Sequence, residues 1–143
     1  MHTSLRICLA WLCVSTLAPC VAAAQTVKIG YIATLSGQQA QLGIDSVDGF
    51  KLALQKLNGK LGGVPVELVV VDDQLKPEIG IEQAKRLVEK EQTPIIVGTT
   101  FSNILMAIVQ PTTRARVFLI SPNAGPSPLA GAQAIRTSSR SHS

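Results

Sequence analysis

The sequence predicts an α/β fold in which helices cover both faces of a parallel sheet. Four short runs rich in Val and Ile alternate with three stretches in which apolar residues recur at helical spacing. This alternation indicates βαβ units, whose right-handed crossovers keep neighbouring strands parallel. With 46% hydrophobic and only 15% charged residues, the chain of 143 residues has the composition of a domain with a buried core.

The first expected strand covers residues 27–33, and the first expected helix follows it. The apolar residues of this helix recur at intervals of three or four: Val47, Phe50, Leu54 and Leu57. Asp45 or Ser46 is a suitable N-cap, because either side chain accepts a hydrogen bond from the free N–H groups of a first turn. Asn58 and Gly59 are typical of a helix end.

The second expected strand, residues 66–72, follows a Gly62-Gly63 turn. It is almost continuously apolar, as are strands of parallel sheets that are covered on both faces. Pro77 is expected to open the second helix. One apolar face of that helix is formed by Ile81, Ala84, Leu87 and Val88.

The third expected strand, residues 95–97, is introduced by Pro94. Ser102 is placed to cap the third helix, which we expect to end near Pro111 because proline lacks a backbone N–H. The fourth expected strand covers residues 117–120. Numbered along the chain, the four strands are expected in the spatial order 2-1-3-4.

A ligand is expected at the carboxyl ends of the strands, because an open parallel sheet forms a crevice where its strand order reverses. Three loops lie at that edge: Thr34–Gly43, Gly98–Asn103 and Ser121–Gly125. Ser102 begins a helix there, so its hydroxyl, the free backbone N–H groups and the helix dipole favour an anion such as a carboxylate. An ordinary N-cap explains the same serine, and both interpretations stay open.

Other motifs have simpler interpretations. Ser36 and Gly37 either bring backbone amides to a ligand or serve only the turn between strand and helix. The Asp72-Asp73 pair is interpreted as a solvated strand end. The glycines around Lys60 follow a helix and precede a strand, which is the reverse of a phosphate-binding loop, so we expect a turn there.

Charge and reactive residues exclude several classes of function. The whole chain has a net charge of +4, but residues 25–133 carry ten Lys/Arg and nine Asp/Glu, a net charge of +1. With 3% aromatic residues no base-stacking platform is expected, so nucleic acid is not an expected partner. His and Cys are absent from residues 25–133, which argues for binding rather than catalysis, and we expect neither a metal nor a cofactor.

The first 24 residues have the layout of a cleaved secretory signal. Arg6 precedes an apolar run at residues 7–17, and three alanines end the segment before Gln25. The run is shorter than the roughly 20 residues that a membrane span needs. We therefore expect an exported chain whose mature form begins at Gln25.

Four strings occur in a characteristic order along the chain: Val27–Tyr31, Leu35–Gly37 with Gly43, Val69–Asp73 and Ile120–Gly125. Together they resemble the leucine/isoleucine/valine-binding family of bacterial solute-binding proteins, over Thr26 to about Gln133. The resemblance implies that residues 25–133 form the amino-terminal lobe of a type I periplasmic binding protein, with a flavodoxin-like strand order. Such proteins close two α/β lobes on a small solute and deliver it to the membrane permease of an ABC importer.

The resemblance also implies roles for individual residues. Ser102 matches the serine that holds the ligand α-carboxylate, and Leu42 matches a position that packs against the ligand. The loop at residues 123–125 matches one whose carbonyl and amide contact the α-ammonium and carboxylate groups. The candidate ligand-binding residues are Ser36, Leu42, Ser102, Asn103, Asn123, Ala124 and Gly125.

Gly125 departs from the family pattern, in which branched-chain amino-acid binders often have a threonine. The solute is therefore left open among branched-chain amino acids, small amides, carboxylates and aromatic acids. The alternative function is a ligand-sensing regulator of the amide-sensor type, which has the same lobes. A mature start at Gln25 favours export, whereas an intact Met1 favours the regulator.

Members of the family are more than twice as long, so we expect a truncated fragment that is inactive alone. Relatives continue beyond Gln133 with an Asn-Pro-Tyr-Phe-type segment, whereas residues 134–143 are rich in Ser and Arg. Restoring one base before Ala134 permits Cys-Asn-Pro-Tyr-Phe. We hypothesise a one-base deletion that left a disordered, out-of-frame tail.

Overall fold

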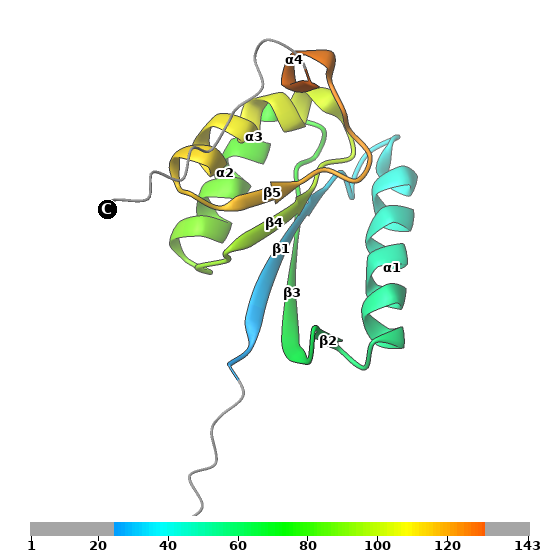
Figure 1. Cartoon of the computed structure of the whole chain (residues 1–143). Helices are drawn as coiled ribbons and strands as arrows, with labels where there is room; N and C mark the ends of the chain where they lie inside the picture. The colour runs from blue at the N-terminus through cyan, green and yellow to red at the C-terminus, as the bar shows by residue number, and fades with distance from the viewer. Residues whose placement is uncertain (1–24, 131–143) are drawn as a thin grey trace, which may run out of the picture.

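Within residues 25–130, which a computed structural model describes, the chain forms a mostly parallel five-stranded sheet with helices on both faces (Figure 1). The expected signal at residues 1–24 and the expected tail at 134–143 lie outside this range. In chain order the elements are β1 (Val27–Ala33), α1 (Ala40–Lys56), β2 (Lys60–Leu61), β3 (Val64–Asp72), α2 (Pro77–Glu89), β4 (Ile95–Gly98), α3 (Ser102–Arg114), β5 (Phe118–Ile120) and α4 (Ser127–Ala130). The sheet order is β2-β3-β1-β4-β5, which contains the expected order of the four parallel strands.

The strand bounds follow the sequence expectations closely. β1 has the expected bounds, β4 and β5 differ from them by one residue each, and α2 begins at Pro77. The short strand β2 was not expected. It pairs antiparallel with the start of β3, around positive-φ glycines at Gly62 and Gly63, and therefore β3 begins two residues earlier than predicted.

Helix α1 begins at Ala40, so the prediction of an N-cap at Asp45 or Ser46 is wrong. Gln39 occupies the N-cap, and Gly43 in the first turn is buried. A Cβ atom at Gly43 would lie 1.9 Å from the carbonyl oxygen of Thr34. The early start of α1 thus brings its first turn against the end of β1, a contact that helical periodicity does not reveal.

Helix α3 continues through Pro111 to Arg114, so the prediction that it ends near this proline is also wrong. Two threonines after the proline donate to helix carbonyls: Thr112 Oγ1 lies 2.8 Å from the Ile108 oxygen, and Thr113 Oγ1 lies 2.7 Å from that of Val109. The missing N–H of Pro111 would have bonded to the Ala107 oxygen, and the threonine hydroxyls bond to the next two carbonyl oxygens along the helix.

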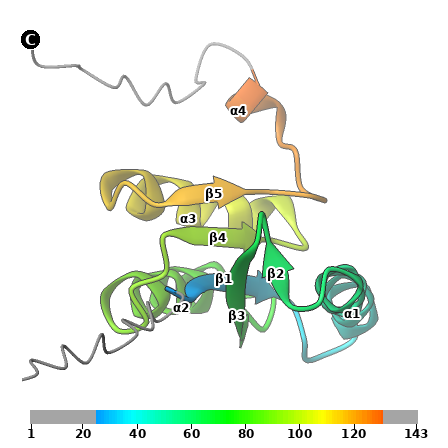
Figure 2. The same ribbon diagram turned by 60° about the horizontal axis from the view of Figure 1, so that its bottom comes forward.

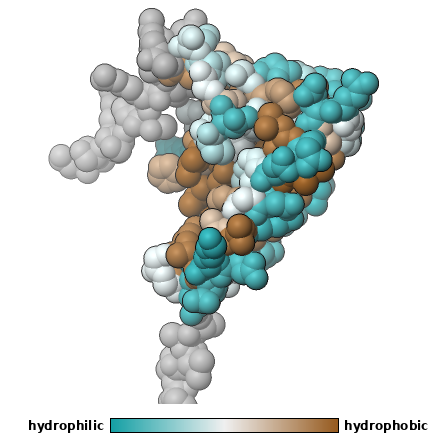
Figure 3. All heavy atoms as spheres, turned by 90° about the vertical axis from the view of Figure 1, so that its right-hand side faces the viewer, coloured by the Kyte–Doolittle hydropathy of each residue, from teal (hydrophilic) through white to brown (hydrophobic). Residues whose placement is uncertain are grey.

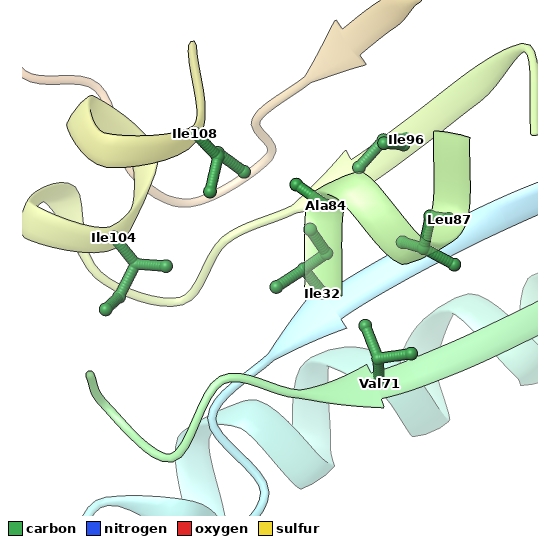
Figure 4. Packing of buried hydrophobic residues seen from close by; sticks show 7 residues of the cluster. All are labelled: Ile32, Val71, Ala84, Leu87, Ile96, Ile104 and Ile108. Carbon is green, nitrogen blue, oxygen red and sulfur yellow. The ribbon is translucent and has the colours of Figure 1, made fainter. Parts of the chain in front are cut away.

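The first face of the sheet is covered by α2 and α3. Figure 4 shows side chains from three strands and both helices converging there: Ile32, Val71, Ala84, Leu87, Ile96, Ile104 and Ile108. Every second residue of β1, β3 and β4 points toward these helices, as strand geometry requires. This cluster is the main apolar core of the described chain.

Among the described residues 25–130, α1 is the one helix that covers the second face (Figure 2). Tyr31 anchors this helix, because its hydroxyl lies 2.7 Å from the Ser46 hydroxyl and its ring meets that of Phe50 edge-on at 5.4 Å. Phe118 and Ile120 of β5 point to the same side but are exposed, at 74% and 53%. Figure 3, which views the molecule from the α1 side, shows apolar patches among the hydrophilic atoms.

Candidate functional site

Hydrogen bonds bring the three expected loops together at the carboxyl ends of the strands. The backbone N–H of Thr34, after β1, donates to Thr100 Oγ1 at 3.3 Å. The side-chain amide of Asn123, after β5, donates to the Thr100 carbonyl oxygen at 2.8 Å. Thr100, which lies between β4 and α3, therefore links the loops on either side of it, as the strand order led us to expect.

Ser102 is the first residue of α3, so its prediction as the N-cap is wrong by one position. Phe101 is the N-cap, with an extended backbone, and no side chain of the described residues caps this helix end. Ser102 is exposed. Its hydroxyl and the N–H groups of the first turn thus remain available to an anion, which is the arrangement that a carboxylate site requires.

The second part of the candidate site is the loop that follows β5. Asn123 and Gly125 are exposed, whereas Ala124 is buried against Leu105 and Val109 of α3. The Ser121 hydroxyl donates to the Ala124 carbonyl oxygen. Ser121, α3 and Thr100 thus hold this loop in place. The remaining candidate, Asn103, lies next to Ser102 in the first turn of α3 and is exposed.

Ser36 and Leu42 lie on the α1 side of the same edge. Both are exposed, Leu42 at 49%, in the connection and first turn that follow β1. Gly43, in the first turn of α1, lets this helix approach the Thr34 carbonyl oxygen, because it has no Cβ atom to meet that oxygen. Gly98 has a similar role at the end of β4, where φ is +140° and a Cβ atom would lie 2.2 Å from the Ile32 oxygen.

Asp73 is fully buried, so the interpretation of Asp72-Asp73 as a solvated strand end is wrong for this residue. Its Oδ1 accepts hydrogen bonds from the Thr34 hydroxyl at 2.6 Å and from the Leu75 N–H at 2.9 Å. Its Oδ2 is buried and has no hydrogen-bond partner among residues 25–130. A hint in the sequence was Thr34, a polar residue directly after the buried strand β1.

The two aspartates differ in pKa. Burial raises the pKa of Asp73, and this effect, with the nearby charge of Asp72, outweighs the hydrogen bonds from Thr34 and Leu75. Burial acts on Asp72 in the same direction, but the N–H groups of Leu35 and Gln74, with the Ser36 hydroxyl, lower its pKa overall. Asp72 therefore stays ionised more readily than its neighbour.

The described residues also form a groove away from these loops. A groove of about 370 Å³ lies between the carboxyl-terminal halves of α2 and α3, at the opposite edge of the sheet, and contains none of the candidate residues. Across residues 25–130, no three His, Cys, Asp or Glu side chains are grouped to hold a metal ion. In the same range no helix is long and apolar enough to cross a membrane.

The chain is similar to known solute-binding proteins. A family model described as periplasmic binding protein matches residues 26–141, a range that includes most of the segment for which a shifted reading frame was hypothesised. The Leu/Ile/Val-binding protein homolog 7 of Brucella suis biovar 1 (strain 1330) is 33% identical over 103 residues, which are 71% of this chain and 26% of that protein.

Solved structures give the same result. An ABC transporter substrate-binding protein from Sphaerobacter thermophilus matches with a TM-score of 0.74 and 34% identity, over 79% of this chain and 30% of that one. LivJ from Streptococcus pneumoniae, solved with isoleucine, has a TM-score of 0.71 and 31% identity over 76% and 32%. A solute-binding protein from R. palustris, solved with benzoate, has a TM-score of 0.72 and 32% identity over 76% and 30%.

The chain thus spans between a quarter and a third of the length of these relatives. The matches agree with one another in both sequence and fold, and the fold is that of a type I periplasmic binding protein lobe. They confirm the resemblance drawn from the sequence strings. The chain belongs to the periplasmic binding protein family.

Proposed function

We propose that this chain is the ligand-binding amino-terminal lobe of a solute-binding component of an ABC importer. The solute is a branched-chain amino acid or a related small carboxylate or amide, and the lobe acts by binding rather than by catalysis. The membrane permease of the importer is the partner that receives the solute. Residues 1–24 direct export to the periplasm, and cleavage leaves Gln25 at the mature terminus.

The uncapped start of α3 is the observation that supports this proposal most strongly. Ser102 presents an exposed hydroxyl beside the free N–H groups of a helix of 13 residues. The Asn123–Gly125 loop lies near it through the bond of Asn123 to Thr100. A carboxylate placed at this point receives hydrogen bonds and the favourable end of the helix dipole.

The relatives point to a carboxylate as the common feature of the ligand. LivJ was solved with isoleucine and the R. palustris protein with benzoate, and both ligands carry a carboxylate group. Only isoleucine carries an ammonium group. Because Gly125 offers no hydroxyl to an ammonium, we propose that the carboxylate contact is shared and that the ammonium contact is weak or absent in this chain.

Compact ligand sites bury roughly 70–90% of a small ligand, and a single lobe leaves much of it in water. We therefore expect the chain alone to bind more weakly than micromolar. NMR titration of the ¹⁵N-labelled chain with isoleucine and with benzoate detects such weak binding. The proposal predicts shifts of the amide signals of Ser102, Asn103 and the 123–125 loop as either ligand is added.

Benzyl alcohol, which lacks the carboxylate of benzoate, is the matched control ligand and should shift none of these signals. If both carboxylates leave the signals unchanged at millimolar concentration, the proposed site is wrong. Mass spectrometry of the exported chain tests localisation separately. A terminus at Gln25 supports export, and a retained Met1 contradicts it.

A further inference from the structure

Thr34 is hydrogen-bonded to two distant parts of the fold and packs closely against a third. Its N–H donates to Thr100 Oγ1 at 3.3 Å, and its hydroxyl donates to Asp73 Oδ1 at 2.6 Å. Its carbonyl oxygen faces Gly43 of α1, closely enough that a Cβ atom there would lie 1.9 Å away. Thr34 itself is fully buried and contacts no solvent.

These contacts join the ends of four strands. Thr34 follows β1, Asp73 follows β3, and Thr100 follows β4. The Thr100 carbonyl oxygen in turn accepts the bond from Asn123, which follows β5. We call Thr34, Asp73, Thr100 and Asn123 the Thr34 network. It spans the edge of the sheet that carries the candidate ligand-binding residues.

We propose that Thr34 is a positioning residue, which holds the loop leading to Ser102 and the loop of Asn123 in one arrangement through the Thr34 network. Its role for ligand binding rests on the proposed function, but the positioning itself is a property of the free protein. Thr34 is buried, so it acts through its neighbours and does not touch the solute.

The geometry explains why the hydroxyl matters as well as the backbone. Asp73 is anchored at the end of β3 by the bond from its N–H to the Ala33 oxygen at 3.1 Å and by the Leu75 N–H. The Thr34 hydroxyl ties β1 to this anchored carboxylate. Without this hydroxyl, the end of β1 is no longer bonded to Asp73, and the Thr34 N–H that donates to Thr100 is held less firmly.

The test compares Thr34→Val with Thr34→Ser in the full chain, by NMR without ligand. Valine keeps the shape of threonine and removes the hydroxyl, so the signals of Thr100, Ser102 and the Asn123 side-chain amide should shift. Serine keeps the hydroxyl and should restore them. Thr93→Val is the matched control, because Thr93 is also buried and donates to the Leu87 oxygen at 3.0 Å, at the amino end of β4.

Unchanged signals in Thr34→Val, or equal shifts in Thr93→Val, would overturn the proposal. A measurement on the unmodified chain covers the case in which Thr34→Val does not fold. The Thr34 amide should exchange with solvent at least about tenfold more slowly than the exposed Ser36 amide, because it is buried and hydrogen-bonded. Equal exchange rates would contradict the network.

Ligand titration separates this proposal from the proposed function. Where the unmodified chain binds isoleucine or benzoate, Thr34→Val should weaken binding about five- to tenfold, as expected for the loss of one hydrogen bond that organises a site. Loop signals that shift in Thr34→Val while no ligand binds the unmodified chain would support positioning and refute the proposed function. Full affinity in Thr34→Val would refute the positioning role.

Discussion

The two faces of the sheet are built differently. The face under α2 and α3 buries five side chains completely: Ile32, Leu87, Ile96, Ile104 and Ile108. On the face under α1 the strands supply the buried residues Ile29, Tyr31, Ala33 and Val97, and the helix adds only the side chain of Val47. Tyr31 joins the helix by a hydroxyl pair and an aromatic contact. Beyond α1, on the same face, β5 exposes Phe118 and Ile120.

This difference separates what holds the fold from what shapes the site. The α2 and α3 face has the larger cluster of buried apolar residues and should contribute more stabilisation, since apolar burial contributes about 25 cal/mol per Å². The α1 face depends on close approach at Gly43 and on a few specific contacts. The effects of substitutions on stability should therefore differ between the two faces.

The largest expected effect is at Ile96, which is fully buried on the α2 and α3 face. Ile96→Ala should lower the free energy of unfolding by about 2–5 kcal/mol, since it removes buried methylene groups and leaves a cavity. Ile95→Ala, on the adjacent residue that points to the α1 face, should cost about 1–2 kcal/mol because that side chain is only half-buried. Urea unfolding measures both, and equal losses would remove the distinction between the faces.

The next effect concerns how α1 approaches the sheet. Gly43→Ala should destabilise the chain by about 1–3 kcal/mol, because its Cβ atom would meet the Thr34 carbonyl oxygen and push the helix outward. Gly49→Ala is the control on the same helix, where a Cβ atom meets nothing within 4 Å. It should stabilise α1 by about 0.5–1 kcal/mol. Thermal unfolding measures both changes in stability. If the two substitutions changed stability in the same direction, the close approach of Gly43 to Thr34 would be contradicted.

The third prediction concerns Asp73, the buried carboxyl group that follows β3. The pKa of Asp73 is raised by burial, so its contribution to stability is present below the usual value near 3.8 and is lost as the pH rises through its raised value. Relative to Asp73→Asn, the unmodified chain should therefore gain stability as the pH falls from 7 toward 4. Urea unfolding across this range measures the difference.

Asp72 acts in the opposite direction, because its lowered pKa gives stability that is lost only as the pH falls below the usual value. Both proteins in the comparison contain Asp72, so its contribution cancels. A difference in stability that stays constant between pH 7 and 4 would show that Asp73 ionises as an ordinary aspartate.

The smallest effect on stability is expected at Phe118, which is 74% exposed on the edge strand β5. Phe118→Ser should change the free energy of unfolding by no more than about 0.5 kcal/mol. It should nevertheless reduce self-association, because apolar edge strands recruit other chains. Sedimentation velocity measures association. A large loss of stability would mean that this side chain is covered.

The features that the sequence predicted are those set by local pattern. A short run rich in Val and Ile predicted β1, the proline at position 77 marked the start of α2, and the βαβ rhythm predicted the strand order. The candidate loops met at one edge for the same reason. Local pattern placed the start of α3 only to within one residue, since Ser102 was predicted as the N-cap and is the first helical residue. Helix starts are commonly uncertain by a residue or two.

The features that the sequence missed depend on contacts between distant segments. The buried Asp73 contacts the Thr34 hydroxyl, 39 residues away, and lies close to Gly80 of α2. The early start of α1 requires the approach of Gly43 to the end of β1. Neither contact leaves a periodic signal, so helical spacing placed the start of α1 at the first obvious capping residues.

The carboxylate contact at Ser102 is the central claim, and one substitution tests it most directly. The NMR titration with benzoate and isoleucine is repeated on Ser102→Ala, with Ser127→Ala as a control at an exposed serine outside the candidate set. The account predicts that Ser102→Ala weakens binding by about 1.5–3 kcal/mol, the range for a hydrogen bond to a charged group, and that Ser127→Ala binds as the unmodified chain does. Equal affinity in Ser102→Ala and the unmodified chain would contradict it.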